Sequence, residues 1–260
     1  MKSIELGNLI IEVTRRCNLS CAHCLRGAQQ RMNINREHIE QLLSNVCYID
    51  VVTFTGGEPT LYLKGIEDTL DVIEKNGITV NSFYIATNGC FSRKARTKLM
   101  ELIVRMNDIA YNMDDIPTIT IELSNEIYHY EEIVGKDLGN LLDDNVKFLS
   151  ILKGFGSKYR KTSVSMKLND VTYYRPYSLI SEGRAVKLNT KCEKISARDI
   201  MAEPYKVEVN DSYISIIDET YLAANGNVIF GCNYSFKRID GMATYTAKSF
   251  TEKINQYDHE

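Results

Sequence analysis

The chain lacks several features that would place it in a specialised class. It has no tryptophan, only four prolines among 260 residues, and a net charge of 31 − 34 = −3, so its composition gives no support for nucleic acid as a partner. No apolar run reaches the length of a membrane span, and Met1–Gly7 lacks the apolar core of a secretory signal. These absences predict a globular cytoplasmic protein that binds neither nucleic acid nor membrane.

Cysteine is the residue that the chain uses unusually. Seven cysteines without a secretory signal favour metal ligands or free thiols over a disulfide framework. Three of them, Cys17, Cys21 and Cys24, lie within eight residues in the pattern C-x3-C-x2-C. A tight loop can turn these side chains inward, and three thiolates satisfy three irons of a cubic [4Fe–4S] cluster that four cysteines otherwise hold. The pattern therefore predicts a cluster with one open iron as the working site.

Two further features of this loop bear on its chemistry. Arg15, Arg16 and Arg26 flank the thiols, and we expect their charges to lower the thiol pKa values unless the loop is simply solvated. His23 offers a fourth ligand for zinc as an alternative to the cluster. However, C-x3-C-x-H-C is cramped for tetrahedral zinc, whose ligands usually come as two separated pairs.

Hydrophobic patterning predicts alternating strands and helices over the first two thirds of the chain. The predicted strands are residues 9–14, 50–55, 80–86, 117–123 and 162–168, and the predicted helices are residues 35–46, 64–76, 92–106 and 138–152. This alternation with short loops predicts parallel βαβ units, and hence an α/β fold. Beyond residue 170 the pattern loosens to a hairpin-like pair, residues 213–217 and 221–230, with turn chemistry at 225–227.

Unusual polar clusters follow each of the first four predicted strands. The cysteine loop follows the first, Gly56-Gly57-Glu58-Pro59 the second and Asn88 the third, while Glu122 and Ser124 lie near the end of the fourth. Ligands collect at the carboxyl ends of parallel strands, so these groups are expected to meet. The paired glycines let backbone approach a ligand closely, although Gly-Gly-x-Pro is also typical of a tight turn.

C-x3-C-x2-C after the first strand, with GGEP after the second, resembles the radical S-adenosylmethionine (radical SAM) enzymes over roughly residues 8–190. The resemblance implies a partial (β/α)6 TIM-like barrel over residues 1–190, one [4Fe–4S] cluster on Cys17, Cys21 and Cys24, and S-adenosylmethionine on the fourth iron. It implies an enzyme that reductively cleaves this cofactor to a 5′-deoxyadenosyl radical, which abstracts a hydrogen atom from a substrate. An electron donor such as flavodoxin or ferredoxin is implied as well.

The resemblance also implies a cofactor pocket but assigns no catalytic residue. Gly56, Gly57 and Glu58 are expected to hold the methionine amine, and His23 to lie beside the adenine. The full set implied is His23, Thr55, Gly56, Gly57, Glu58, Asn88, Glu122 and Ser124.

The tail carries a second, looser resemblance. Residues 175–185 and 222–232 resemble the post-barrel segment of enzymes with a SPASM or twitch extension, which holds auxiliary iron–sulfur clusters and often accompanies peptide modification. Because only Cys192 and Cys232 remain here, we expect residues 191–260 to form a hairpin and irregular tail capping the barrel without an auxiliary cluster. Cys47, Cys90, Cys192 and Cys232 are then expected to be buried small residues, with Cys90 as an alternative hydrogen donor.

The tail resemblance favours a peptide or protein side chain as substrate. A glycyl-radical-enzyme activase, an enzyme for a small molecule such as a nucleoside or amino acid, and a non-catalytic iron–sulfur or zinc protein are the alternatives. His38 and His129 are expected at the surface, since neither lies at metal spacing with another histidine. The expected packing residues near the mouth are Tyr173, Tyr174, Tyr177 and Arg184.

Overall fold

The computed structural model describes residues 2–111, 118–124, 126–152, 163–167, 179–188, 192–193, 204, 206–242 and 245–259, with the backbone alone for 163–167, 192–193 and 258–259. Tyr173, Tyr174, Tyr177 and the side chain of Cys192 therefore lie outside the described residues. Within the described ranges, no helix combines the length and the apolar character that crossing a membrane requires.

A single large sheet organises the described chain. The nine-stranded sheet runs in the order β11-β10-β9-β1-β2-β3-β4-β5, with β8 beside β9, and β9 through β5 pair in parallel. Its strands are β1 Ser3–Thr14, β2 Val46–Gly56, β3 Thr79–Thr87, β4 Thr118–Leu123, β5 Ser163–Lys167, β8 Val207–Val209, β9 Tyr213–Leu222, β10 Asn227–Phe230 and β11 Tyr245–Thr246. The sheet is open rather than closed, as a partial barrel requires, so the predicted α/β class is confirmed.

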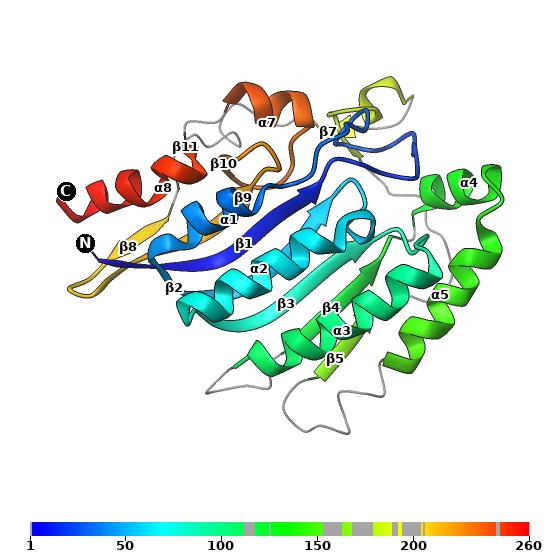
Figure 1. Ribbon diagram of the computed structural model, residues 1–260. Helices are drawn as coiled ribbons and strands as arrows, with labels where there is room; N and C mark the ends of the chain where they lie inside the picture. The colour runs from blue at the N-terminus through cyan, green and yellow to red at the C-terminus, as the bar shows by residue number, and fades with distance from the viewer. Residues whose placement is uncertain are drawn as a thin grey trace.

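Helices connect the parallel strands. α1 (Arg36–Leu42), α2 (Leu63–Asn76) and α3 (Arg93–Ile109) lie side by side on one face of the sheet (Figure 1). The further helices are α4 Ile127–Gly135, α5 Gly139–Leu152, α7 Phe236–Met242 and α8 Ala247–Ile254, with short 3-10 turns at Leu43–Asn45, Pro59–Tyr62, Ala185–Lys187 and Asn255–His259. A separate two-stranded sheet pairs β6 (Leu179–Ile180) with β7 (Cys192–Glu193).

Local sequence signals set several helix ends, although α1 stops at Leu42 rather than at the predicted Val46, which begins β2. Asn35 caps α1 by accepting a hydrogen bond from the Glu37 amide, and Ser92 caps α3 by accepting one from the Ala95 amide. Gly77 ends α2 in the left-handed conformation, with φ +64°, that glycine adopts without steric cost. These helices bury apolar faces against the sheet, where the Phe54 and Phe83 rings stack 6.4 Å apart.

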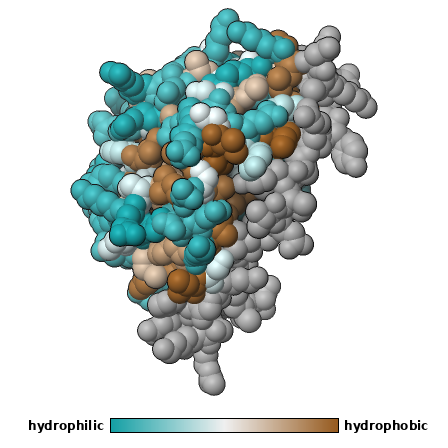
Figure 2. All heavy atoms as spheres, turned by 90° about the vertical axis from the view of Figure 1, so that its right-hand side faces the viewer, coloured by the Kyte–Doolittle hydropathy of each residue, from teal (hydrophilic) through white to brown (hydrophobic). Residues whose placement is uncertain are grey.

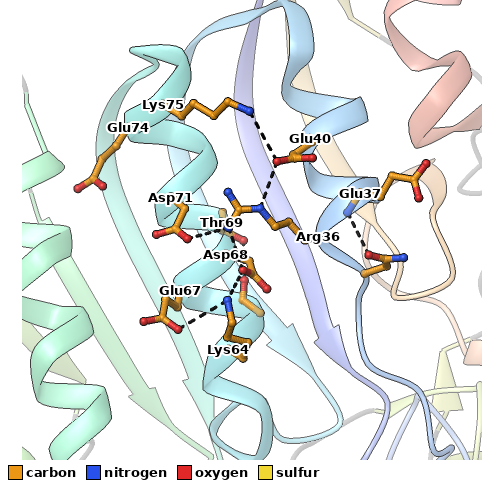
Figure 3. A network of polar contacts seen from close by, with 12 residues as sticks. Arg36, Glu37, Glu40, Lys64, Glu67, Asp68, Thr69, Asp71, Glu74 and Lys75 are labelled. Carbon is orange, nitrogen blue, oxygen red and sulfur yellow. Dashed lines mark hydrogen bonds and ion pairs between the residues drawn. The ribbon is translucent and has the colours of Figure 1, made fainter.

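Ion pairs connect the outer surfaces of α1 and α2 (Figure 3). Arg36 contacts Glu40 at 3.1 Å and Asp71 at 2.8 Å, while Lys64 pairs with Asp68. The Arg36 and Lys64 side chains are 38% and 55% exposed, so solvent screens these pairs and each contributes little to stability. The network links α1 to α2 on their outer faces.

The structure differs from the sequence prediction beyond residue 124. Residues 213–222 form one continuous strand, and its parallel pairing with β1 makes part of the predicted extension a member of the main sheet. The predicted turn is confirmed, because Gly226 adopts φ +84° and Val228 pairs with Leu222. α4 was not predicted at all. The division of the chain at residue 190 stays a prediction.

Candidate active site

The carboxyl ends of β1, β2, β3 and β4 converge on the side of the sheet where α4 lies (Figure 1). A cavity of about 420 Å³ opens there. All of the predicted site residues except Glu122 line it, and the list is Cys17, Cys21, His23, Cys24, Thr55, Gly56, Gly57, Glu58, Asn88 and Ser124. Glu122 lies half-buried in β4, paired with Ala86 and Lys167 in the ladder, and does not border the cavity.

The three clustered thiols share one wall of this cavity. Cys21 is buried, and Cys17 and Cys24 are half-buried. A turn joins Cys21 to Cys24, in which the Cys24 amide donates to the Cys21 carbonyl at 3.1 Å. Burial raises the pKa of Cys17 to about 11 and that of Cys21 to about 12. The thiols of Cys17 and Cys21 are therefore protonated at neutral pH, and binding a metal centre must displace those two protons.

The charge that opposes the raised pKa values of Cys17 and Cys21 comes mainly from Arg184 rather than from the flanking arginines. Arg15 is fully buried and turns away from the thiols, donating to Glu12 at 2.5 Å and to Asp240 at 2.9 Å. Arg26 donates to the Tyr234 carbonyl at 2.7 Å and lies over the Tyr221 ring. Both side chains therefore bind the C-terminal segment to the cysteine loop, and Arg26 also lines the cavity.

Arg184 supplies the positive charge that the loop itself does not. It lines the cavity, and its charge favours the thiolate forms of Cys17 and Cys21 against the larger effect of burial. Its Nε donates to the Cys21 carbonyl at 2.8 Å, and its amide donates to the Cys24 carbonyl at 2.9 Å. The residue expected only to pack near the mouth thus holds two of the cysteines in place.

The glycine pair after β2 allows the loop after β2 to pack closely against the loop after β1. A Cβ on Gly56 would lie 2.1 Å from the Thr14 carbonyl oxygen, and one on Gly57 would lie 2.3 Å from that of Arg16. The Gly57 amide donates to the Thr14 carbonyl at 2.7 Å, and the Glu58 amide donates to the Arg16 carbonyl at 2.8 Å. Glycine is required here because the backbone leading into the cysteine loop occupies the space of any side chain.

Glu58 ties the loop after β2 to the loop after β3. Its carboxylate is buried and accepts hydrogen bonds from the Thr60 hydroxyl at 2.6 Å, the Thr87 hydroxyl at 2.8 Å and the Asn88 amide at 2.7 Å. Burial raises the pKa of Glu58, while these hydrogen bonds oppose the rise. The carboxylate therefore organises the cavity floor while one edge of the residue borders the cavity.

Asn88 faces the cysteine loop. Its Nδ2 donates to Asn18 Oδ1 at 2.9 Å and reaches Cys17 Sγ at 3.8 Å, while its Oδ1 accepts from the Cys90 amide at 2.8 Å. The Leu19 amide also donates to Cys17 Sγ, at 3.4 Å. Hydrogen bonds to a ligating sulfur are one of the factors that set the reduction potential of an iron–sulfur cluster.

α4 and the residue before it contribute side chains to the cavity that the sequence did not predict there. His23 stacks on Tyr128 with ring centroids 5.0 Å apart and meets His129 edge-on at 4.8 Å. Glu126 and His129 both line the cavity, so the prediction of a surface position for His129 is wrong. Burial lowers the pKa of His23 to about 4, so its imidazole is neutral at physiological pH.

The cysteines outside the loop occupy varied environments. Cys90 is buried as predicted and lies behind the cavity wall, and Cys232 is half-buried. Cys47 is exposed, contrary to prediction, because it alternates to the outer side of β2 between buried Val46 and half-buried Tyr48.

The donor set on this wall fits a [4Fe–4S] cluster. Three cysteines line one cavity, which matches three of the four irons, and Cys90 does not line it. Two N–H groups already point at Cys17 Sγ, as they do toward ligating sulfurs. Beside the thiols, the cavity has room for a further ligand bordered by the loops after β2 and β3.

Two known proteins are similar in sequence to parts of this chain. It is 26% identical over 169 residues to an uncharacterised protein of Methanocaldococcus jannaschii, covering 63% of this chain and 54% of that protein. It is 24% identical over 146 residues to YydG of Bacillus subtilis, a putative peptide biosynthesis protein, covering 54% of this chain and 42% of that protein. The chain thus spans about half the length of these curated relatives.

A solved structure shares the fold. Native anSMEcpe with bound AdoMet and the Cp18Cys peptide superposes with a TM-score of 0.52 at 14% identity, covering 96% of this chain and 79% of that one. The family model for the radical SAM superfamily matches residues 11–172, which include the cysteine loop and the loops after β2, β3 and β4. The chain therefore belongs to the radical SAM superfamily, whose members are enzymes that use a [4Fe–4S] cluster and S-adenosylmethionine.

Proposed function

We propose that the chain binds one [4Fe–4S] cluster through Cys17, Cys21 and Cys24, cleaves S-adenosylmethionine reductively, and modifies a side chain of a peptide or protein. The observation that carries the first part is the placement of three thiols on one wall of a single cavity at the strand ends. When bound, the cluster supplies the electron that breaks the S–C5′ bond, and the resulting 5′-deoxyadenosyl radical abstracts a hydrogen atom from the substrate.

The residues of this chain bind and orient the two groups. The three cysteines hold the cluster, while Gly56, Gly57 and Glu58 border the space for the methionine amine. His23, Thr55, Asn88 and Ser124 complete the cofactor side of the cavity. Glu122 belongs to the proposed set only through its neighbours, since it pairs with Ala86, which lines the cavity, but does not line the cavity itself.

Apolar side chains exclude water from the same space. Leu19, Leu25, Leu179 and Ile180 line the cavity between the polar groups. A carbon radical reacts with its nearest hydrogen donor, so a dry wall directs it to the bound substrate. Arg184 and His129 stand at the same cavity and are available to contact a substrate.

Two observations support a peptide substrate. YydG is named for peptide biosynthesis, and anSMEcpe has been solved with a bound peptide. Figure 2 shows apolar side chains among polar ones on the side of the molecule that carries α4 and α5. On α4 itself, Tyr130 is 43% exposed and Val134 is 56% exposed. We propose that residues 1–190 form the catalytic barrel, that residues 191–260 close its β1 side, and that flavodoxin or ferredoxin delivers the electron.

Anaerobic reconstitution tests the first part. After incubation with iron and sulfide, we expect about four irons per chain, and the reduced protein should convert S-adenosylmethionine to 5′-deoxyadenosine. Cys21→Ala should abolish both, while Cys47→Ala should leave both unchanged. A chain that binds iron yet yields no 5′-deoxyadenosine with any reductant would reject the catalytic proposal.

Deuterium transfer tests the substrate class. Deuterated peptides, a glycyl-radical enzyme and deuterated nucleosides or amino acids are supplied separately. We expect deuterium in 5′-deoxyadenosine from a peptide. Transfer from one of the other two classes alone would replace the peptide assignment and leave the cofactor chemistry intact.

A further inference from the structure

We propose that the cluster-free chain holds a second kind of metal centre, a single divalent transition-metal ion bound by Cys21, His23 and His129. One ligand atom from each of these residues lies within 4.8 Å of the others. The site uses one cysteine of the cluster set and two imidazoles outside it. Zn²⁺ is the expected occupant, and its presence excludes the cluster from Cys21.

The distances are close to those that a tetrahedral ion requires. Zn–N bonds of about 2.0–2.1 Å and a Zn–S bond of about 2.3 Å place neighbouring ligand atoms about 3.3–3.7 Å apart. The three side chains must therefore close by about 1 Å, which rotation of the side chains supplies. His23 belongs to the cysteine loop and His129 to α4, so the ion would join two elements that already meet through ring contacts.

The carboxylate beside His129 favours the same assignment. Glu126 Oε2 lies 2.8 Å from His129 Nδ1 without the alignment of a hydrogen bond, and a small rotation of either side chain would form that bond and leave Nε2 for a metal. Metal-binding histidines almost always present the other ring nitrogen to a carboxylate or carbonyl group in this way. His23 Nδ1 is buried and has no hydrogen-bond partner among the described residues, so a ligand would satisfy a polar atom that otherwise stays unpaired.

The chemistry of the donor set suits zinc or cobalt. Two neutral imidazoles and one thiolate form a borderline-soft set with an open fourth position for water, and zinc binds such sets in four-coordinate geometry. On binding, the Cys21 thiol loses its proton to solvent, so one proton is released for each ion bound. No electron is transferred, and the ion leaves when a chelator competes for it.

This centre has a consequence for maturation. Because Cys21 serves both centres, a chain that has taken up Zn²⁺ cannot complete its cluster until the ion is removed. Zn²⁺ bound at this site therefore competes with cluster assembly. The inference does not depend on which substrate the mature enzyme uses.

Cobalt titration of the full-length, cluster-free protein under anaerobic conditions provides the test. We expect one Co²⁺ per chain, a thiolate-to-cobalt charge-transfer band, and displacement by Zn²⁺. Cys21→Ser should remove the band, whereas Cys17→Ser and Cys24→Ser should retain it. Glu126→Gln should weaken binding about 10–100-fold, and His129→Ala should weaken it at least as much.

Matched variants keep the outcome interpretable. Glu131→Gln lies exposed on the same helix, and His38→Ala removes a histidine remote from the cavity, so neither should change the affinity. His129→Cys should restore binding with a second charge-transfer band, which separates lost ligation from lost folding. Equal loss of the band in all three cysteine variants, with unchanged affinity in His129→Ala, would overturn the proposal. This result reports on metal binding alone, and stands whether or not the reconstituted protein cleaves S-adenosylmethionine.

Discussion

Arg184 Nε donates a hydrogen bond to the carbonyl oxygen of Cys21 across 163 residues of sequence, at 2.8 Å. The Arg184 amide binds the Cys24 carbonyl as well, and Gly183 packs against the same stretch, since a Cβ on it would lie 2.2 Å from the Leu25 carbonyl oxygen. The turn at residues 181–188 therefore acts as a clasp on the cysteine loop. Loop geometry, and with it the spacing of the sulfurs, depends on contacts that are remote in sequence.

Replacing Arg184 with alanine should lower cluster occupancy. The charged hydrogen bond to Cys21 contributes about 1.5–3 kcal/mol, so its loss lets the loop sample conformations that separate the thiols. Iron bound per chain after reconstitution measures the effect. Lys187→Ala, exposed in the same turn, is the control and should bind iron as the parent does. Equal iron content in both variants would show that the clasp has no influence.

Gly57→Ala should destabilise the fold by about 3 kcal/mol, because the new Cβ overlaps the Arg16 carbonyl oxygen and both loops must shift. Urea unfolding followed by circular dichroism gives the free energy. Gly135→Ala has no atom within 4 Å of its Cβ and should leave stability unchanged or slightly higher. Similar midpoints for the two variants would contradict the close approach of the loops after β1 and β2.

The Arg15–Glu12 pair should show strong coupling. Both side chains are fully buried, and Glu12 Oε2 also accepts from the Tyr221 hydroxyl at 2.6 Å. Arg15→Met leaves Glu12 as an unpaired buried charge and should cost about 3–5 kcal/mol, whereas adding Glu12→Gln should restore much of that loss. A double-mutant cycle from urea unfolding measures the coupling. Additive single changes would mean that the two charges do not sense each other.

Asn88→Asp should make the cluster harder to reduce. The substitution removes an N–H donor directed at Cys17 Sγ and adds negative charge, and both changes disfavour an extra electron. A redox titration followed by electron paramagnetic resonance should show a more negative potential. Asn18→Ala removes the partner amide but keeps the Asn88 donor, so its potential should stay near that of the parent.

Glu182 should make stability depend on pH. Burial raises the pKa of this carboxyl, but hydrogen bonds from Ser235 and the ion pair with Arg238 outweigh burial and hold the pKa below its usual value. Its contribution is therefore present above the ordinary pKa of a glutamate and is lost as pH falls through the lower folded-state pKa. The stability difference between the parent and Glu182→Gln, from urea unfolding, should shrink between about pH 6 and about pH 3.5. Glu131→Gln should show no such trend.

The parallel core could be predicted from hydrophobic patterning and helix caps, because those signals are local in the sequence. Asn35, Gly77 and Ser92 act where the sequence predicted. The convergence of four strand ends on one cavity followed from topology alone. The roles of Gly56 and Gly57 did not follow, since their sequence does not reveal that the neighbouring backbone, rather than a ligand, is what approaches them.

α4 escaped prediction for a physical reason. It spans nine residues and buries only Tyr128 and Ile133, so its apolar periodicity is weak. The position of His129 at the cavity depends on this helix, so it could not be predicted from the sequence without it. The lowered pKa of His23 likewise depends on burial by α4 and its neighbours, and no residue spacing in the sequence encodes that burial. Glu126 followed by His129, three residues apart on an acidic segment, was the signal available.

The pairing of β9 with β1 imposes an order on biosynthesis. β1 is translated before β9, so one of its edges stays open until Tyr213–Leu222 has been made, and Arg15 lacks its Asp240 partner for longer still. The strand that leads into the cysteine loop therefore gains its last neighbour only after about 200 further residues have been translated. The folded geometry of the thiols is thus reached late in synthesis.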